Sequence, residues 1–333
     1  GINLGLRKMA DATNTHTFWE LIRIGRWHVE GEAYDRALAM VVEAQAALPM
    51  ARFWGMGASA SSDGQFFAAT EQGEAMNLVN AKYGNTPGLK AYSHVSDQYA
   101  PFATQVIPAT ASEAPYILDG LLMNDAGRHI REQFADTGGF TDHVFGACAI
   151  LGYRFAPRIR DLPSKRLYAF NPSAAPAHLR AMIGGKINQA MIERNWPDIL
   201  RIAATIAAGG IAPSQILRKL ASYPRQNELA TALREVGRVE RTLFMIDWIL
   251  DADLQRRAQI GLNKGEAHHA LKRAISFHRR GEIRDRSAEG QHYRIAGMNL
   301  LAAIIIFWNT MKLGEVVNTR AASGTHIGVT TRK

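Results

Sequence analysis

Three acidic residues stand where carboxylates could bind divalent cations: Asp63, Asp136 and Glu266. Phosphoryl transfer to or from a nucleic acid needs two such cations about 4 Å apart, which activate the nucleophile and stabilise the leaving oxygen. Because hard cations such as Mg²⁺ prefer oxygen ligands, two or three converging carboxylates suffice. Asp136 also precedes Thr137-Gly138-Gly139, where bare backbone could approach a phosphate closely. The residue types are therefore compatible with metal-dependent phosphodiester chemistry.

Each acid also has a structural interpretation that needs no chemistry. Asp63-Gly64 lies between two runs that could both be strands, and this dipeptide predicts a hairpin turn that joins them. Asp136 could cap a turn or a helix. Glu266, which we expect in the first turn of a helix, would be favoured there by the helix dipole. Glu282 in GEIRDR remains an alternative to Glu266.

Two histidines lie beside Glu266. On the predicted helix Glu266, His269 and Arg273 share one face, because they are three and four residues apart. His268 and His269 resemble a metal-binding pair, but adjacent helical residues point in different directions. We therefore expect no histidine metal site.

The elements that must position these side chains follow from periodicity and from turn residues. Several β-like runs between residues 51 and 110 precede a helix at 112–123, a strand or short helix at 129–136, another helix and a short strand. This mixed order predicts an α/β domain. Helices are expected on both sides of it, at 17–48, 196–208, 213–221, 226–250, 264–280 and 289–312.

Composition limits the class of protein. Hydrophobic residues make up 47% of the 333 positions, so the chain can form a substantial core. The net charge of +9 suits a polyanionic partner, nucleic acid before others. The single cysteine, Cys148, excludes an intrachain disulfide and a cysteine-based zinc cluster, and it fits a reducing cytoplasm. The apolar stretch at 295–308 is too short to span a bilayer, which predicts a buried core helix and no membrane partner.

Basic residues cluster near the candidate acids, which favours contacts with phosphate groups on a chain of this charge. No Walker-type loop, GxGxxG unit or GxSxG elbow occurs in the sequence, so nucleotide hydrolysis and serine-esterase chemistry lose support. The residues that we expect to contact DNA are Arg158, Arg160, Arg225, Lys272, Arg273, Arg279 and Arg280.

The chain closely resembles the Tn-three family of bacterial transposases from residue 1 to about residue 313. The resemblance rests on these stretches, in order: SSDGQFF, HVSDQYAPF, DTGGFTDHVFG, LGYRFAPRIRDL, RKLASYPRQN, GRVERTLFMIDWI, GLNKGEAHHALKRAISFHRRGEIRDRS and NLLAAIIIFWNT. It implies a DDE transposase in which Asp63 bridges two Mg²⁺ ions and Asp136 and Glu266 each complete one, with Mn²⁺ able to substitute. Asp142, in the same block as Asp136, stays open as the second aspartate, although it could simply cap a helix.

The resemblance also implies a fold and a division of the chain. The expected fold is α/β, an RNase H-like mixed sheet with flanking helices, a large helical insertion and C-terminal helices. The expected parts are a helical lead-in at 1–50, the core with the first two acids at 51–175, the insertion at 176–262, the helices that carry the glutamate at 263–313 and a flexible tail at 314–333.

The implied activity is cleavage of transposon 3′ ends and their transfer to target DNA, in replicative transposition through a cointegrate. DNA and further copies of the transposase are the implied partners, in the cytoplasm of a bacterium at its nucleoid. Family members are longer, with an N-terminal part that recognises the transposon ends, so we expect a C-terminal part without specific end recognition. Two alternatives remain: a non-catalytic DNA-binding or assembly fragment, and an RNase H-like nuclease without strand transfer.

Overall fold

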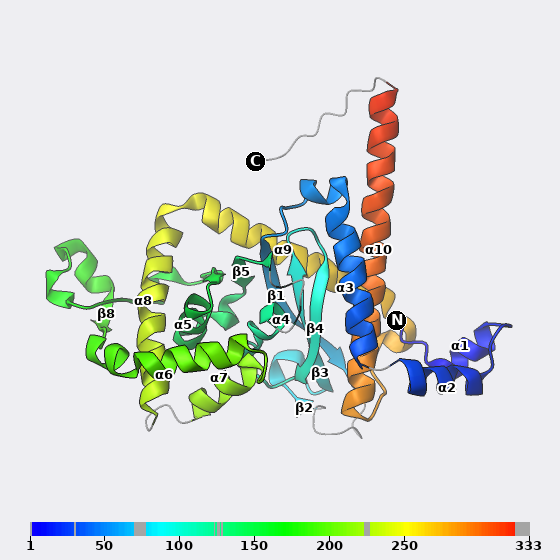
Figure 1. Cartoon of the computed structure of the whole chain (residues 1–333), viewed down its shortest axis with the longest axis horizontal. Helices are drawn as coiled ribbons and strands as arrows, with labels where there is room; N and C mark the ends of the chain where they lie inside the picture. The colour runs from blue at the N-terminus through cyan, green and yellow to red at the C-terminus, as the bar shows by residue number, and fades with distance from the viewer. Residues whose placement is uncertain are drawn as a thin grey trace.

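A mixed sheet occupies the middle of the molecule, between a block of helices on one side and two long helices on the other (Figure 1). The computed structural model describes residues 2–29, 31–69, 78–122, 124, 127, 129–222 and 227–323. The α/β class predicted from the order of the elements is confirmed by this arrangement.

Six strands form the sheet: β1 (Ser59–Ala68), β2 (Leu78–Val79), β3 (Pro87–Ser96), β4 (Pro101–Pro108), β5 (Glu132–Ala135) and β6 (Arg154–Phe155). β3 pairs antiparallel with β1, with β4 and with β2. On the other edge of β1, β5 runs parallel to it and β6 runs parallel to β5. The paired segments of β1 and β5 therefore both lead to the same end of the sheet.

Asp63 and Gly64 lie inside β1, so the prediction of a hairpin turn at this dipeptide is wrong. The pairing of β1 with β3 runs unbroken through both residues, from Ala60 to Ala68. Neither residue has the positive φ that a type I′ turn requires. Glycine at position 64 is explained by space and not by a turn. A Cβ atom there would lie 2.6 Å from a carboxylate oxygen of Glu113, whose side chain packs against the strand.

Helices surround the sheet: α1 (Leu6–Ala12), α2 (Phe18–His28), α3 (Gly31–Ala47), α4 (Asp119–Leu122), α5 (Asp142–Ile150), α6 (Gln189–Ala207), α7 (Pro213–Ser222), α8 (Glu228–Leu250), α9 (Ala252–Ile275) and α10 (Ala288–Ala322). A small parallel pair, β7 (Leu167–Ala169) and β8 (Ile183–Lys186), precedes α6. α8 and α9 are separated by Asp251 alone, whose side chain accepts hydrogen bonds from the amides of Asp253 and Leu254 and so starts α9.

Most helices predicted after residue 176 are present with shifted ends, but α9 is much longer than the helix expected at 264–280. Glu266 consequently lies deep inside α9 and not in its first turn, so the helix dipole does not explain it. α9 also runs across the boundary expected between residues 262 and 263. The segment expected to form an insertion shares a hydrophobic core with the sheet, since Leu233 and Phe244 of α8 pack in one cluster with Phe134 of β5.

Two other predicted segments differ from the structure. The helix expected at 112–123 is reduced to a 3-10 turn, Ala114–Tyr116, followed by the short α4. The run at 129–136, left open between strand and helix, contributes the strand β5.

Gly146 of α5 lies so close to the Leu233 backbone that a Cβ atom would not fit. This glycine therefore lets α8 pack closely against α5.

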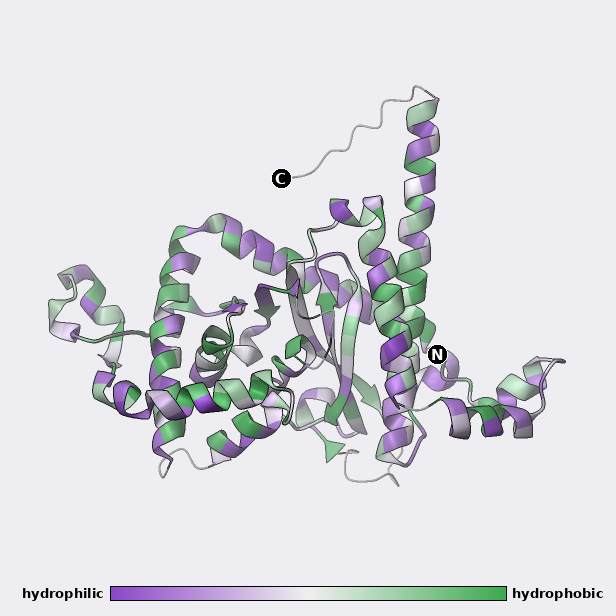
Figure 2. Cartoon of the chain, viewed as in Figure 1, coloured by the Kyte–Doolittle hydropathy of each residue, from purple (hydrophilic) through white to green (hydrophobic). Residues whose placement is uncertain are grey.

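α10 corrects two expectations about the C-terminal region. It continues to Ala322, so residues 314–322 are helical and not a loose tail, while 324–333 lie outside the described residues. Ile295 and Met298 are buried, but outward residues such as Ile304 and Trp308 are exposed, so the stretch 295–308 is not a fully buried core helix. Figure 2 shows hydrophobic and hydrophilic residues alternating along the part that projects beyond α3. By length and composition alone α10 could cross a membrane.

Candidate functional site

Asp63 and Asp136 lie side by side at the same level of the sheet. The parallel register of β1 and β5 pairs Ser62 with Ala135, one residue before each acid. Asp136 directly follows β5 and precedes the 3-10 turn Thr137–Gly139. Because the two strands are parallel neighbours, the two carboxylates belong to one region of the sheet and interact electrostatically.

α9 crosses the sheet face that carries the Asp63 side chain (Figure 1). Alternate residues of β1 point to one face, so Ser61, Asp63 and Gln65 share it. The Gln65 side chain donates a hydrogen bond to the His269 carbonyl oxygen at 3.1 Å, and Gly265 leaves room for the Ser61 hydroxyl. These contacts hold the middle of α9 directly over Asp63.

Asp63, Glu266 and His269 form a cluster of three possible metal ligands. One carboxylate oxygen of each acid and one ring nitrogen of the histidine all lie within 4.8 Å of one another. The Nδ1 atom of His269 is 3.9 Å from Oδ2 of Asp63. Glu266 is exposed, whereas His269 is buried, so the cluster opens to solvent on the Glu266 side. The geometry brings together the first and third predicted acids.

The sequence placed His269 on the helical face of Glu266, but a histidine metal site was not expected because His269 was judged together with His268. The two rings do point apart, as expected: Nε2 of His268 lies 3.0 Å from the Asn299 side-chain oxygen, on the far side of α9. The spacing of three residues between Glu266 and His269 was the available signal, since it places both on one helical face.

Burial and the negative charge of neighbouring acids raise the pKa of Asp63 to about 7. Burial is the largest cause, followed by the nearby Glu113, and the charges of Glu266 and Asp136 add to it, while the hydrogen bond from the Gly64 amide acts against them. A bound cation would relieve this resistance of Asp63 to ionisation.

The neighbours of Asp63 are held in defined charge states. Burial, then Lys272 and Arg273, lower the pKa of His269 to about 3, so its ring is neutral at neutral pH and its contact with Asp63 is not an ion pair. For Asp136 burial opposes ionisation, but the Thr137 amide and Arg158 outweigh it and lower the pKa. An Arg158 nitrogen lies 2.8 Å from Asp136 Oδ1, which fixes this carboxylate.

Glu113 is a fourth acid near Asp63 that the sequence did not reveal. Its carboxylate covers Gly64 and accepts a hydrogen bond from the buried Lys90 ammonium at 2.7 Å. Lys90 also donates to the Ala111 carbonyl oxygen. No motif marks Glu113, because only the path of the chain after β4 brings it back over β1.

Neither alternative acid lies in the cluster. Asp142 begins α5 and is ion-paired with Arg238 and Arg241 of α8. Glu282 pairs with Arg284 at 2.9 Å. Its neighbour Ile283 bridges to Ala69, six residues along the strand direction from Asp63, which corresponds to roughly 20 Å.

The basic residues expected to contact DNA have four different outcomes. Arg158 is occupied by Asp136, and Arg225 lies outside the described residues. Lys272 is fully buried and donates a hydrogen bond to the Ser93 hydroxyl, so its prediction as a DNA contact is wrong. Lys272 lies on the face of α9 that packs against the sheet. The exposed members are Arg160, Arg273, Arg279 and Arg280.

Replacing Lys272 by Met should stabilise the protein more at acid than at alkaline pH. Burial lowers the pKa of Lys272 from 10.5 to about 7, although Asp63 acts in the opposite sense. Between those values the unfolded chain keeps a proton that the native state releases, so wild-type stability falls as the pH falls through this range. Urea unfolding of both proteins should show the stability gain of Lys272→Met larger at about pH 6 than at about pH 9, by a few kcal/mol. An equal gain at both pH values would contradict a buried, titrating lysine.

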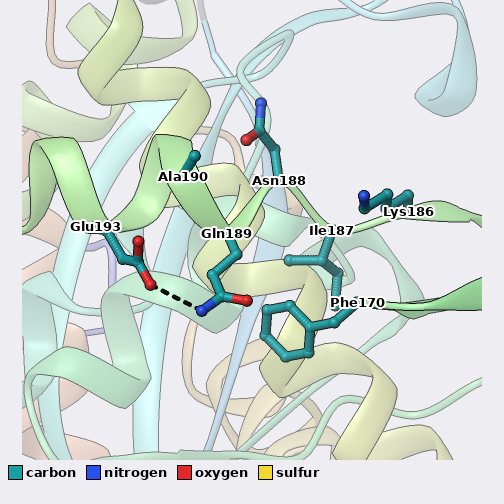
Figure 3. A pocket seen from close by; sticks show the side chains of 7 residues that line it. All are labelled: Phe170, Lys186, Ile187, Asn188, Gln189, Ala190 and Glu193. Atoms are coloured by element: carbon teal, nitrogen blue, oxygen red, sulfur yellow. Dashed lines mark hydrogen bonds between the residues drawn. The ribbon is translucent and has the colours of Figure 1, made fainter.

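A pocket of about 690 Å³ lies away from the acids, between the β8 strand and the start of α6. Figure 3 shows that its only carboxylate, Glu193, is hydrogen-bonded by the Gln189 amide. Its lining residues are Phe170, Lys186, Ile187, Asn188, Gln189, Ala190 and Glu193. It contributes nothing to the cluster on the sheet.

Comparison with known proteins identifies the family. The family model described as "Tn3 transposase DDE domain" matches residues 1–331. The chain belongs to the Tn3, or Tn-three, transposase family. It is 50% identical over 97% of its length to the transposase for transposon Tn501 of Pseudomonas aeruginosa, and 48% identical over 97% to that for Tn3926 of Escherichia coli. The transposase for Tn1546 of Enterococcus faecium is 39% identical, also over 97% of this chain.

The resemblance inferred from sequence blocks is thereby confirmed. The chain spans about a third of the length of these relatives, with 33% of each covered. A DDE domain of this family implies phosphodiester cleavage or transfer and a divalent metal.

Proposed function

We propose that this domain catalyses metal-dependent cleavage of DNA at transposon 3′ ends and the transfer of those ends to target DNA, in replicative transposition through a cointegrate. Asp63, Asp136 and Glu266 are the proposed catalytic acids and metal ligands, with Mg²⁺ as the cofactor and Mn²⁺ as a substitute. One observation carries the proposal: α9 brings Glu266 to Asp63, while β5 sets Asp136 beside Asp63 on the neighbouring strand.

The sheet supports an RNase H-like core. β1, β3 and β4 are antiparallel, and β5 and β6 extend the sheet in parallel on the other side of β1, which is the arrangement such a core needs. In this reading residues 51–175 supply the sheet and the two aspartates, 1–50 a helical lead-in, and 176–262 an insertion that packs on the same core. The glutamate then comes from the helical region that follows.

The donor set fits divalent cations. The Asp63 and Glu266 oxygens converge, and the pKa of Asp63 is raised by burial and by the surrounding acids, a cost that a cation removes. When bound, the cations would activate the attacking oxygen and stabilise the leaving one. Asp63, central among the acids, would be shared, with Glu266 on one side and Asp136, oriented by Arg158, on the other.

DNA is the proposed partner. The exposed Arg160, Arg273, Arg279 and Arg280 would contact its phosphates, and Arg158 would do so while holding Asp136. Self-association in a complex with DNA and a place at the nucleoid in the bacterial cytoplasm complete the proposal. We take α10 as a protein-packing helix and not a membrane span, because Ile295, Met298 and Ala302 lie in a core with β1 and β3.

A non-catalytic DNA-binding or assembly fragment is the second candidate, because the exposed arginines could bind DNA without a cleavage step. Nicking of supercoiled plasmid in Mg²⁺ or Mn²⁺ separates the two. We expect the chain to nick DNA, and Glu266→Gln to lose about 100-fold in rate, because a ligand of one cation is gone. Glu282→Gln is the matched control and should keep wild-type activity, since Glu282 pairs with Arg284 and is next to Ile283, which bridges to Ala69 just after β1.

Two results of this assay would count against the proposal. Nicking that survives Glu266→Gln would remove this glutamate from the site. A chain that binds DNA but does not nick it, even with Mn²⁺, would favour the assembly fragment.

A further inference from the structure

His269 is the least explained polar group of the cluster. It is only 4% exposed, yet within the described part of the chain no hydrogen bond reaches either of its ring nitrogens. A histidine ring that makes no hydrogen bond, at the solvent-facing opening of a group of acids, is available to bind a cation. The nearest acceptor is Asp63 Oδ2, 3.9 Å from Nδ1, which is too long for a hydrogen bond.

The backbone holds this ring toward the acids. His269 follows Glu266 by three residues, so the two side chains lie on the same face of α9. The bond from Gln65 to the His269 carbonyl oxygen ties this turn of the helix to β1. His268 differs in direction, because its ring turns to α10, where Nε2 lies 3.0 Å from the Asn299 side-chain oxygen.

We propose that His269 is a third ligand of the cation held by Asp63 and Glu266, which makes that position a mixed oxygen–nitrogen site that favours Mn²⁺ over Mg²⁺. The inference rests on the proposed function, since it assumes that the two acids bind a cation. Imidazole suits transition metals, whereas Mg²⁺ is held by oxygen ligands alone.

The distances fit one ion with little rearrangement. Two ligand atoms at about 2.1 Å from an octahedral cation lie about 3 Å apart when adjacent and about 4.2 Å apart when opposite. The Nδ1 to Oδ2 distance of 3.9 Å falls inside this range. All three ligand atoms lie within 4.8 Å of one another, so the widest pair has to close by at most about 0.6 Å to share one ion.

The two proposed cation positions would then differ in their donors. Asp136 is not a member of the close cluster, and its Oδ1 faces Arg158. The position between Asp63 and Asp136 has carboxylate donors only, whereas the position between Asp63 and Glu266 has a nitrogen as well. Mn²⁺ should therefore discriminate between them.

Electron paramagnetic resonance of Mn²⁺ bound to the 333-residue chain tests the inference without DNA or turnover. The spin-echo modulation of bound Mn²⁺ should carry a ¹⁴N coupling from a directly bound imidazole. His269→Ala should abolish this coupling and weaken Mn²⁺ binding about 10-fold or more, while Mg²⁺ affinity, measured by competition, changes less than about 2-fold. His178→Ala, which removes an exposed histidine outside the cluster, should leave both readouts unchanged.

The outcomes separate the inference from the function on which it rests. Wild-type protein without a ¹⁴N coupling, in a site that Glu266→Gln empties, would overturn the role of His269 and leave the acids as metal ligands. Mn²⁺ binding that survives both Asp63→Asn and Glu266→Gln would overturn the proposed metal site itself. If His269→Ala does not fold, His269→Gln and the wild-type coupling still decide the question.

Discussion

Asp63→Asn should reduce DNA cleavage by more than about 1,000-fold in a full-length transposase that carries this domain, and leave binding of transposon ends intact. Asp63 is the acid closest to all the others: the charges of Glu113, Glu266 and Asp136 all act on it. Loss of a carboxylate shared by both cations removes several kcal/mol of transition-state stabilisation, and each 1.36 kcal/mol is about tenfold in rate.

The same substitution should stabilise the fold when metal is absent. Burial and the neighbouring acids raise the pKa of Asp63 from 3.8 to about 7, so the native state resists ionisation that the unfolded chain allows. Wild-type stability is therefore lost as the pH rises from about 4 to about 7, and the asparagine variant is spared this loss. In chelator at about pH 8 we expect the variant to be more stable by up to a few kcal/mol.

Added metal should reverse the order. A cation that binds only the native state stabilises the wild type in proportion to its concentration, and the variant, which lacks the shared ligand, gains less. Thermal unfolding in chelator and in excess Mn²⁺, together with a gel assay of end cleavage, measures all three effects. Full cleavage by Asp63→Asn, or a variant less stable than wild type in chelator, would sink the assignment of this residue.

The sequence predicted the proximity of the three acids better than their local structure. The types and order of Asp63, Asp136 and Glu266 led to one region of the molecule, but Asp63-Gly64 was interpreted as a turn. Turn propensity is local, whereas the strand here is decided by nine consecutive pairs with β3 and by Glu113 resting on Gly64. Tertiary contacts of that kind leave no periodic signal in the chain.

Tertiary contacts that the local sequence does not reveal also explain why the environments of His269 and Lys272 were not predicted. Both lie on α9, whose mixture of charged, small and apolar residues does not reveal which face is covered. The sheet covers it: His269 comes to lie over Asp63, and Lys272 over Ser93. Lys272, which was predicted to contact DNA, is therefore a buried lysine bonded to Ser93. His269, which was not expected to bind a metal, lies next to Asp63.

A matched pair of aspartates gives the sharpest separation of catalytic from structural acids. Asp136→Asn should reduce cleavage at least about 100-fold and change stability by less than about 1 kcal/mol, because its side chain is 43% exposed and its ion pair with Arg158 is near the surface. Asp142→Asn should instead leave cleavage intact and lower the stability of the fold. That carboxylate is 14% exposed and holds both Arg238 and Arg241 between α5 and α8.

Removing the charge of Asp142 leaves two poorly solvated guanidinium groups without their anion, at a cost of about 3 kcal/mol. The unfolding temperature should fall by about 4 °C, while cleavage per folded molecule stays at the wild-type level. Asparagine has nearly the shape of aspartate, so neither change opens a cavity and the contrast reports charge alone. Loss of cleavage in a folded Asp142→Asn protein, with Asp136→Asn still active, would move the second catalytic aspartate from the end of β5 to the start of α5.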